Sequence, residues 1–172
     1  IDFIRAKALF AEQVKAIKPI VEDKRQMDWA RAVHPLLFLS LQKQGKQVIP
    51  LDIELTEKKR ILIISGPNAG GKSVCLKTVG LLQYMLQCGL LIPLHERSRT
   101  GIFEHIFIDI GDEQSIENDL STYSSHLTNM KYFVKNCNER TIILIDEFGS
   151  GTEPQIGGAI AEALLDRFNR NH

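Results

Sequence analysis

The chain has 172 residues, a length that suits one globular domain with a substantial core. Its 21 Lys and Arg residues balance its 21 Asp and Glu residues, so no overall positive field indicates direct nucleic-acid binding by this chain. No apolar run is long enough to span a membrane, and no secretory signal is visible. Cys75, Cys88 and Cys137 have neither metal-site spacing nor a disulfide pattern, which predicts reduced thiols in a cytoplasmic protein.

The first 65 residues predict one helix and two strands. Apolar residues recur at helical spacing over residues 1–18, and Pro19 would end this amphipathic helix. Residues 48–55 alternate between apolar and polar side chains, as a half-exposed strand does. The apolar run at 61–65 predicts the next strand.

Residues 66–73 carry the most informative motif of the chain. They read Gly-Pro-Asn-Ala-Gly-Gly-Lys-Ser, and they stand between the strand at 61–65 and a helix expected from about Lys72 to Gln87, with Gly89 as its stop. The glycines let backbone N–H groups turn toward a phosphate, and the helix N-terminus adds the positive end of its dipole. Lys72 would reach the β- and γ-phosphates, and the Ser73 hydroxyl would bind Mg²⁺. We therefore predict a nucleoside triphosphate site made of Gly66, Pro67, Asn68, Ala69, Gly70, Gly71, Lys72 and Ser73.

The rest of the chain alternates strands and helices. We expect a short strand at 90–93, a strand at 106–110, a helix over about 122–136, a strand at 141–147 and a last helix over about 157–168. This alternation predicts an α/β phosphate-loop domain.

Two acids end the strand at 141–147. In open α/β sheets, ligands bind at the carboxyl ends of the strands, where these acids would emerge. Asp146 suits the metal-holding acid of a phosphate-loop enzyme, and Glu147 suits the acceptor of a proton from the attacking water. The pair therefore predicts hydrolysis as well as binding.

Ser121 is expected to cap the helix that follows it. A helix N-terminus is also an anion site, so in an ATPase that closes as a dimer it could meet the γ-phosphate held by the partner. The same residues fit a plain capped helix, and the two interpretations are compatible.

Three linked motifs resemble the ATPase domain of the MutS family: residues 66–73, Ser-Thr-Tyr-Ser-Ser-His at 121–126, and Ile-Asp-Glu-Phe-Gly-Ser-Gly-Thr at 145–152. Gly-Asp-Glu-Gln-Ser-Ile-Glu at 111–117 is most similar to the MutS-two subfamily and differs from the mismatch-recognising members. The resemblance covers most of residues 1–170. It implies a phosphate-loop NTPase of the ABC-ATPase class, with a mostly parallel central sheet and flanking helices, that uses ATP and Mg²⁺.

The resemblance also implies a domain organisation and a shared site. Residues 21–172 would form the ATPase domain, and residues 1–20 would be the end of a helix that connects it to a DNA clamp. In a head-to-head homodimer, ATP would lie between the phosphate loop of one subunit and Ser121 of the partner subunit. The further residues implied are Asp146 and Gln114 as metal contacts, Glu147 as the catalytic acid–base residue, and Val48 and Ile49 against the adenine.

The implied role is ATP-driven DNA handling in repair or recombination, with DNA bound by domains outside this chain. The switch histidine of the family is expected beyond residue 172. Three alternatives stay open: a ribosome-acting quality-control factor, a chromosome-maintenance ATPase head and an ABC transporter head. The last two should carry a Ser-Gly-Gly signature where this chain has Leu-Ser-Thr-Tyr at 120–123.

Overall fold

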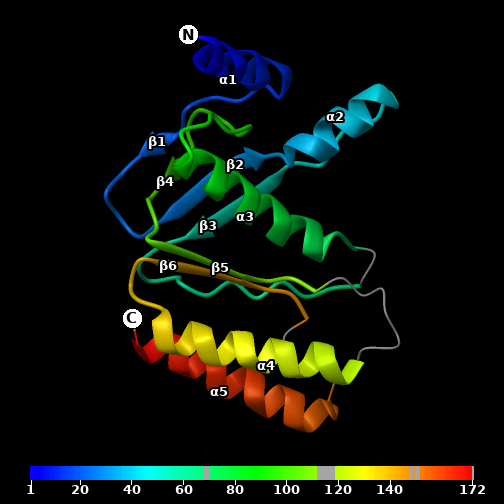
Figure 1. The fold of residues 1–172 in the computed structure, drawn as a ribbon, viewed down its shortest axis with the longest axis vertical. Helices are drawn as coiled ribbons and strands as arrows, with labels where there is room; N and C mark the ends of the chain where they lie inside the picture. Colours follow the sequence, from blue (N-terminus) through cyan, green and yellow to red (C-terminus); the bar gives the residue numbers. More distant parts are fainter. Residues whose placement is uncertain (68–69, 112–118, 148, 150–151, 172) are drawn as a thin grey trace. The chain divides into compact units, whose positions relative to one another are not determined.

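The structure is a computed structural model that describes residues 1–67, 70–111, 119–147, 149 and 152–171. The chain forms two compact units, residues 1–102 and residues 103–172 (Figure 1). Over the described ranges, no helix combines the length and the apolar character needed to cross a membrane.

The first unit is built on a four-stranded sheet with the strand order β1-β4-β2-β3. β1 pairs with β4 in parallel, and β2 pairs with both β4 and β3 antiparallel, so the sheet is mixed. Met27 and Trp29 of β2 are fully buried, as the period-2 alternation of a strand with one covered face requires. The strands are β1 (Ile20–Val21), β2 (Met27–Ala32), β3 (Leu51–Leu55) and β4 (Arg99–Thr100).

Three helices belong to the same unit: α1 (Asp2–Gln13), α2 (Pro35–Lys43) and α3 (Lys72–Gln87). α3 has the bounds expected from the sequence. Gly89 follows it with a φ of +74° and donates its N–H to the Leu86 carbonyl at 2.9 Å, which is the left-handed ending that glycine favours.

α1 ends earlier than the expected boundary at Pro19. Lys15 adopts a φ of +54°, and the N–H of Ala16 donates to the Ala11 carbonyl at 2.8 Å. Backbone hydrogen bonds alone therefore end the helix. A residue other than glycine can take the left-handed conformation at this position, at a cost of about 1–2 kcal/mol.

Two of the expected strands differ from the structure. Residues 61–65 form no strand, and their apolar side chains stay exposed, Ile63 to 73%. A strand needs a neighbouring strand to take up its backbone hydrogen bonds, and none of the described strands of this unit pairs with this run. Of residues 90–93, only Ile92 makes a bridge, to Ile17. The expected strand at 48–55 is confirmed over β3.

Over its described residues, the second unit is a parallel strand pair covered by two helices (Figure 1). The chain runs from β5 (His105–Asp109) through α4 (Asp119–Asn136) to β6 (Thr141–Ile145) and then α5 (Pro154–Asn171). Phe107 stacks on the buried Phe133 at 5.0 Å between ring centroids, which fixes α4 on the strands.

The register of this pair sets the position of the acids. Asp109 lies opposite Ile145, so both strands end at the same edge. The parallel arrangement implied by the resemblance is confirmed for β5 and β6. Within the described residues the larger sheet is mixed, so the mostly parallel sheet is not confirmed.

Candidate functional site

The phosphate loop leads directly into α3 in the first unit. Gly66 has a φ of +148° and Gly71, the N-cap residue of α3, a φ of +82°, which are conformations that side-chain-bearing residues rarely adopt. The Lys72 ammonium donates to the Gly66 carbonyl at 2.7 Å, so the cation lies across the loop. Ser73 lies in the first helical turn, where backbone N–H groups have no partner within the helix. Asn68 and Ala69 are outside the described residues.

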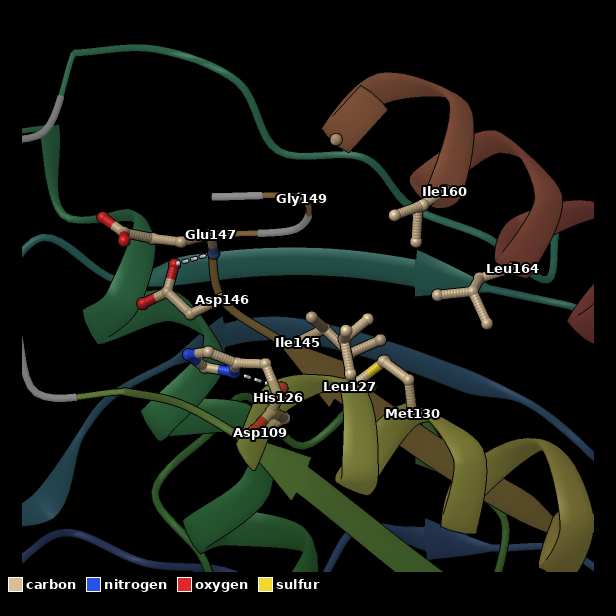
Figure 2. Close-up of a pocket in the computed structure, with 11 residues that line it drawn as sticks. Asp109, His126, Leu127, Met130, Ile145, Asp146, Glu147, Gly149, Ile160 and Leu164 are labelled. Carbon is tan, nitrogen blue, oxygen red and sulfur yellow. Dashed lines mark hydrogen bonds and ion pairs between the residues drawn. The ribbon is translucent and has the colours of Figure 1, made fainter. Parts of the chain in front are cut away.

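Asp146 and Glu147 follow β6 in the second unit. The Asp146 backbone N–H donates to the Asp109 carbonyl at 2.9 Å, which extends the ladder by one residue. The Asp146 side chain is 7% exposed, and its Oδ1 accepts the Glu147 N–H at 3.1 Å. Both carboxylates project from the end of the strand (Figure 2).

Glu147 is exposed and has a φ of +52°. For a residue with a Cβ, the left-handed region costs about 1–2 kcal/mol, and such strain persists where the surrounding structure holds it. Strained backbone of this kind gathers at functional sites, which is consistent with the role predicted for Glu147.

The structure also shows a buried polar cluster that sequence reasoning missed. Asp109, 6% exposed, ends β5; its Oδ2 accepts from His126 Nδ1 at 2.6 Å and its Oδ1 accepts from Asn129 Nδ2 at 2.8 Å. His126 and Asn129 lie one turn apart on α4 and therefore reach the same point. The available signal was that Asp109, like Asp146, is an acid near the end of an apolar run.

A small pocket joins this cluster to the acid pair (Figure 2). Its polar end is formed by Asp109, His126, Asp146 and Glu147, and apolar side chains of β6, α4 and α5 close the other end. Its volume of about 30 Å³ has room for a water molecule and is far too small for a nucleotide.

The other predicted site residues lie as follows. Ile49 is 91% exposed, Val48 is partly buried, and both precede β3. Ser121 was expected as the N-cap, but α4 begins at Asp119, so Ser121 lies within the first turn. Gln114 falls outside the described residues. His34, by contrast, has a structural role, since its Nδ1 accepts the Leu37 N–H at 3.4 Å and caps α2.

The donor chemistry fits Mg²⁺ brought in with a nucleotide. Over the described ranges, no group of three or more His, Cys, Asp or Glu side chains could hold a metal by itself. Mg²⁺ at nucleotide sites needs only one or two protein oxygens in addition to phosphate and water. Ser73 and Asp146 offer oxygens of this kind.

A glycine loop at a helix N-terminus and acids after a parallel strand define a phosphate-loop nucleotide-binding domain. Comparison with known families agrees, since the family described as MutS domain V matches residues 62–172. The chain belongs to the MutS family. Domain V is the ATPase domain of these proteins, so the chain is of an ATPase class.

The chain is similar to MutS2 proteins of several bacteria. The chain is 48% identical over 166 residues to "Endonuclease MutS2" of Shouchella clausii, covering 96% of the chain and 20% of the relative. It is 48% identical over 172 residues to "Putative endonuclease MutS2" of Bacillus subtilis, covering 100% of the chain and 21% of the relative. It therefore spans about a fifth of the length of these relatives. The resemblance to MutS-two is confirmed.

Proposed function

We propose that the chain binds and hydrolyses Mg²⁺-ATP as the head of a MutS-family protein that handles DNA. The observation that carries the proposal is the phosphate loop at the start of α3, with the Lys72 ammonium lying across it. The exposed Glu147 beside the buried Asp146 supports hydrolysis in addition to binding.

Each residue has a defined task in the proposed reaction. The loop N–H groups and Lys72 would bind the β- and γ-phosphates, and Ser73 and Asp146 would hold Mg²⁺. When bound, the metal neutralises phosphate charge. Glu147 takes the proton of the water whose oxygen bonds to the γ-phosphorus, while the bond from that phosphorus to the β–γ bridging oxygen breaks and ADP leaves.

Nucleotide binding is tested with Lys72→Ala, with Lys131→Ala of α4 as a control that removes an exposed lysine elsewhere. A charged hydrogen bond contributes about 1.5–3 kcal/mol, so Lys72→Ala should weaken ATP binding by roughly 10- to 100-fold. Isothermal titration would measure both variants. Equal ATP affinity in the wild type and in Lys72→Ala would contradict the proposed role of the loop in binding phosphate.

We further propose a head-to-head homodimer in which Ser121 of the partner subunit faces the γ-phosphate. Sedimentation with Mg²⁺-ATP should show dimers for Glu147→Gln, because uncleaved ATP stays at the interface. Ser121→Arg should abolish these dimers while ATP still binds. If every variant stayed monomeric with and without ATP, the proposed shared site would be contradicted.

The proposal that DNA is a partner rests on membership of the MutS family. The chain itself has a formal net charge of zero and therefore no general attraction for phosphate. We expect DNA contacts from other parts of a longer protein. Binding of a four-way DNA junction by such a protein should weaken steeply with added salt. A flat salt response together with tight ribosome binding would instead favour a ribosome-acting factor.

A further inference from the structure

The buried cluster of Asp109, His126 and Asn129 lies next to the acid pair and has no task in the reaction above. We propose that it is a positioning cluster, which holds the turn carrying Asp146 and Glu147 in the geometry needed for water activation. The proposal rests on the proposed ATPase function. None of the three side chains binds phosphate in the proposed reaction, so the cluster should control turnover and leave ATP affinity unchanged.

The cluster satisfies a carboxylate that has almost no access to water. A buried carboxylate is costly unless its oxygens accept hydrogen bonds, and both oxygens of Asp109 do so. A carboxylate oxygen accepts hydrogen bonds, so His126 Nδ1 is assigned as the donor. Losing His126 would leave a buried oxygen short of one donor, and the end of β5 would then shift to regain one.

Asp109 is joined to the acid pair through the backbone. Its carbonyl accepts the Asp146 N–H at 2.9 Å, directly after β6 ends at Ile145. The next residue, Glu147, has the left-handed φ of +52°, and its N–H donates back to Asp146 Oδ1. A strained residue keeps its conformation only when neighbouring bonds hold it, so the position of Asp109 sets that of Glu147.

The imidazole also lies beside Gly111, two residues after the end of β5. A methyl group built on Gly111 would lie 3.5 Å from His126 Cε1 and Nε2, so the ring packs against the chain that leaves β5. The same ring lines the pocket with Asp146 and Glu147 (Figure 2). His126 therefore connects α4, the end of β5 and the acid pair.

Three variants test this role: His126→Ala, His126→Asn and, as a control, His105→Asn at the exposed start of β5. Loss of an outer-shell partner costs about 10- to 100-fold in activity, so His126→Ala should lower kcat by that factor. Its Kd for ATP should stay within about twofold of the wild type. The side-chain amide introduced by His126→Asn can replace Nδ1 as donor, so this variant should keep kcat within roughly threefold, as should the control.

Asp109→Asn completes a double-mutant cycle. If both residues act through one bond, Asp109→Asn with His126→Ala should lower kcat little more than His126→Ala alone. Additive losses, an unchanged kcat in His126→Ala, or an equal loss in His126→Asn would each overturn the positioning role. Circular dichroism of every variant separates these effects from loss of folding.

Hydrogen exchange gives a readout that needs no turnover. In the nucleotide-free chain, His126→Ala should speed exchange of the Asp146 and Glu147 N–H groups by about tenfold, and His126→Asn should not. Unchanged exchange would overturn the proposal even if the chain hydrolysed nothing. Glu147→Gln reports separately on the proposed function: full turnover in that variant would refute the ATPase mechanism and leave the exchange result standing.

Discussion

Two adjacent glycines of α5 should respond to the same substitution in opposite directions. A Cβ on Gly157 would lie 2.2 Å from the Gly149 carbonyl oxygen. Real Cβ atoms essentially never come closer than 3.0 Å to another heavy atom, so this contact would be about 0.8 Å too short. A Cβ on Gly158 would meet nothing within 4 Å. Both residues are helical, so the two variants share the same gain in helix propensity.

The free energies follow from these contacts. Alanine in place of helical glycine contributes about 0.5–1 kcal/mol of stability, which is the whole effect expected for Gly158→Ala. Overpacking costs about 1–3 kcal/mol, and against backbone the upper part of that range applies. Gly157→Ala should therefore destabilise the chain by about 1–2 kcal/mol, because the new Cβ would meet a backbone carbonyl oxygen and not the end of a flexible side chain.

Thermal unfolding followed by circular dichroism would measure both changes. For a chain of this size, 1 kcal/mol shifts Tm by about 2–4 °C, so Gly157→Ala should melt roughly 2–8 °C lower and Gly158→Ala about 1–4 °C higher. Gly157→Ala melting at or above the wild-type temperature would refute the close approach of the two backbone segments.

Two further predictions concern titratable groups. Burial and the charge of Lys77 hold the pKa of His34 below 6.5, so the unfolded chain binds a proton there that the folded chain does not. The free energy of unfolding should fall as the pH drops below 6.5, and urea titrations of His34→Gln should show a shallower fall; an identical pH dependence would contradict this. Burial raises the pKa of the Cys137 thiol above 9.0, whereas Cys88 is exposed at the end of α3. Iodoacetamide at about pH 8 should label Cys88 first, as mass spectrometry would show, and equal labelling rates would contradict this.

Local patterns predicted the elements that depend on local chemistry. The bounds of α3 follow from the phosphate loop before it and from Gly89 after it, both of which are readable in the sequence. The prediction of a strand at 61–65 was wrong, because a strand forms only beside a partner strand and a local pattern does not show whether one is present. The early end of α1 at a left-handed Lys15 has no sequence signal either, because backbone bonds make it.

The candidate site divides in the same way. Lys72 and Glu147 are readable because phosphate chemistry demands these residue types at fixed places in a motif. The hydrogen bond between Asp109 and His126 connects a strand with the helix that follows it. Only the packing of α4 on β5 brings Asp109 Oδ2 to 2.6 Å from His126 Nδ1. The motif at 121–126 contains His126, but a local motif does not indicate that Asp109 is its partner.

The proposed hydrolysis is tested first by the steady-state ATPase rate of Glu147→Gln beside the wild type, with ATP affinity measured on the same samples. General base catalysis contributes about 10²- to 10⁴-fold, so Glu147→Gln should lose turnover in that range while still binding ATP. Glu147→Gln hydrolysing ATP at the wild-type rate would contradict the proposed role of Glu147.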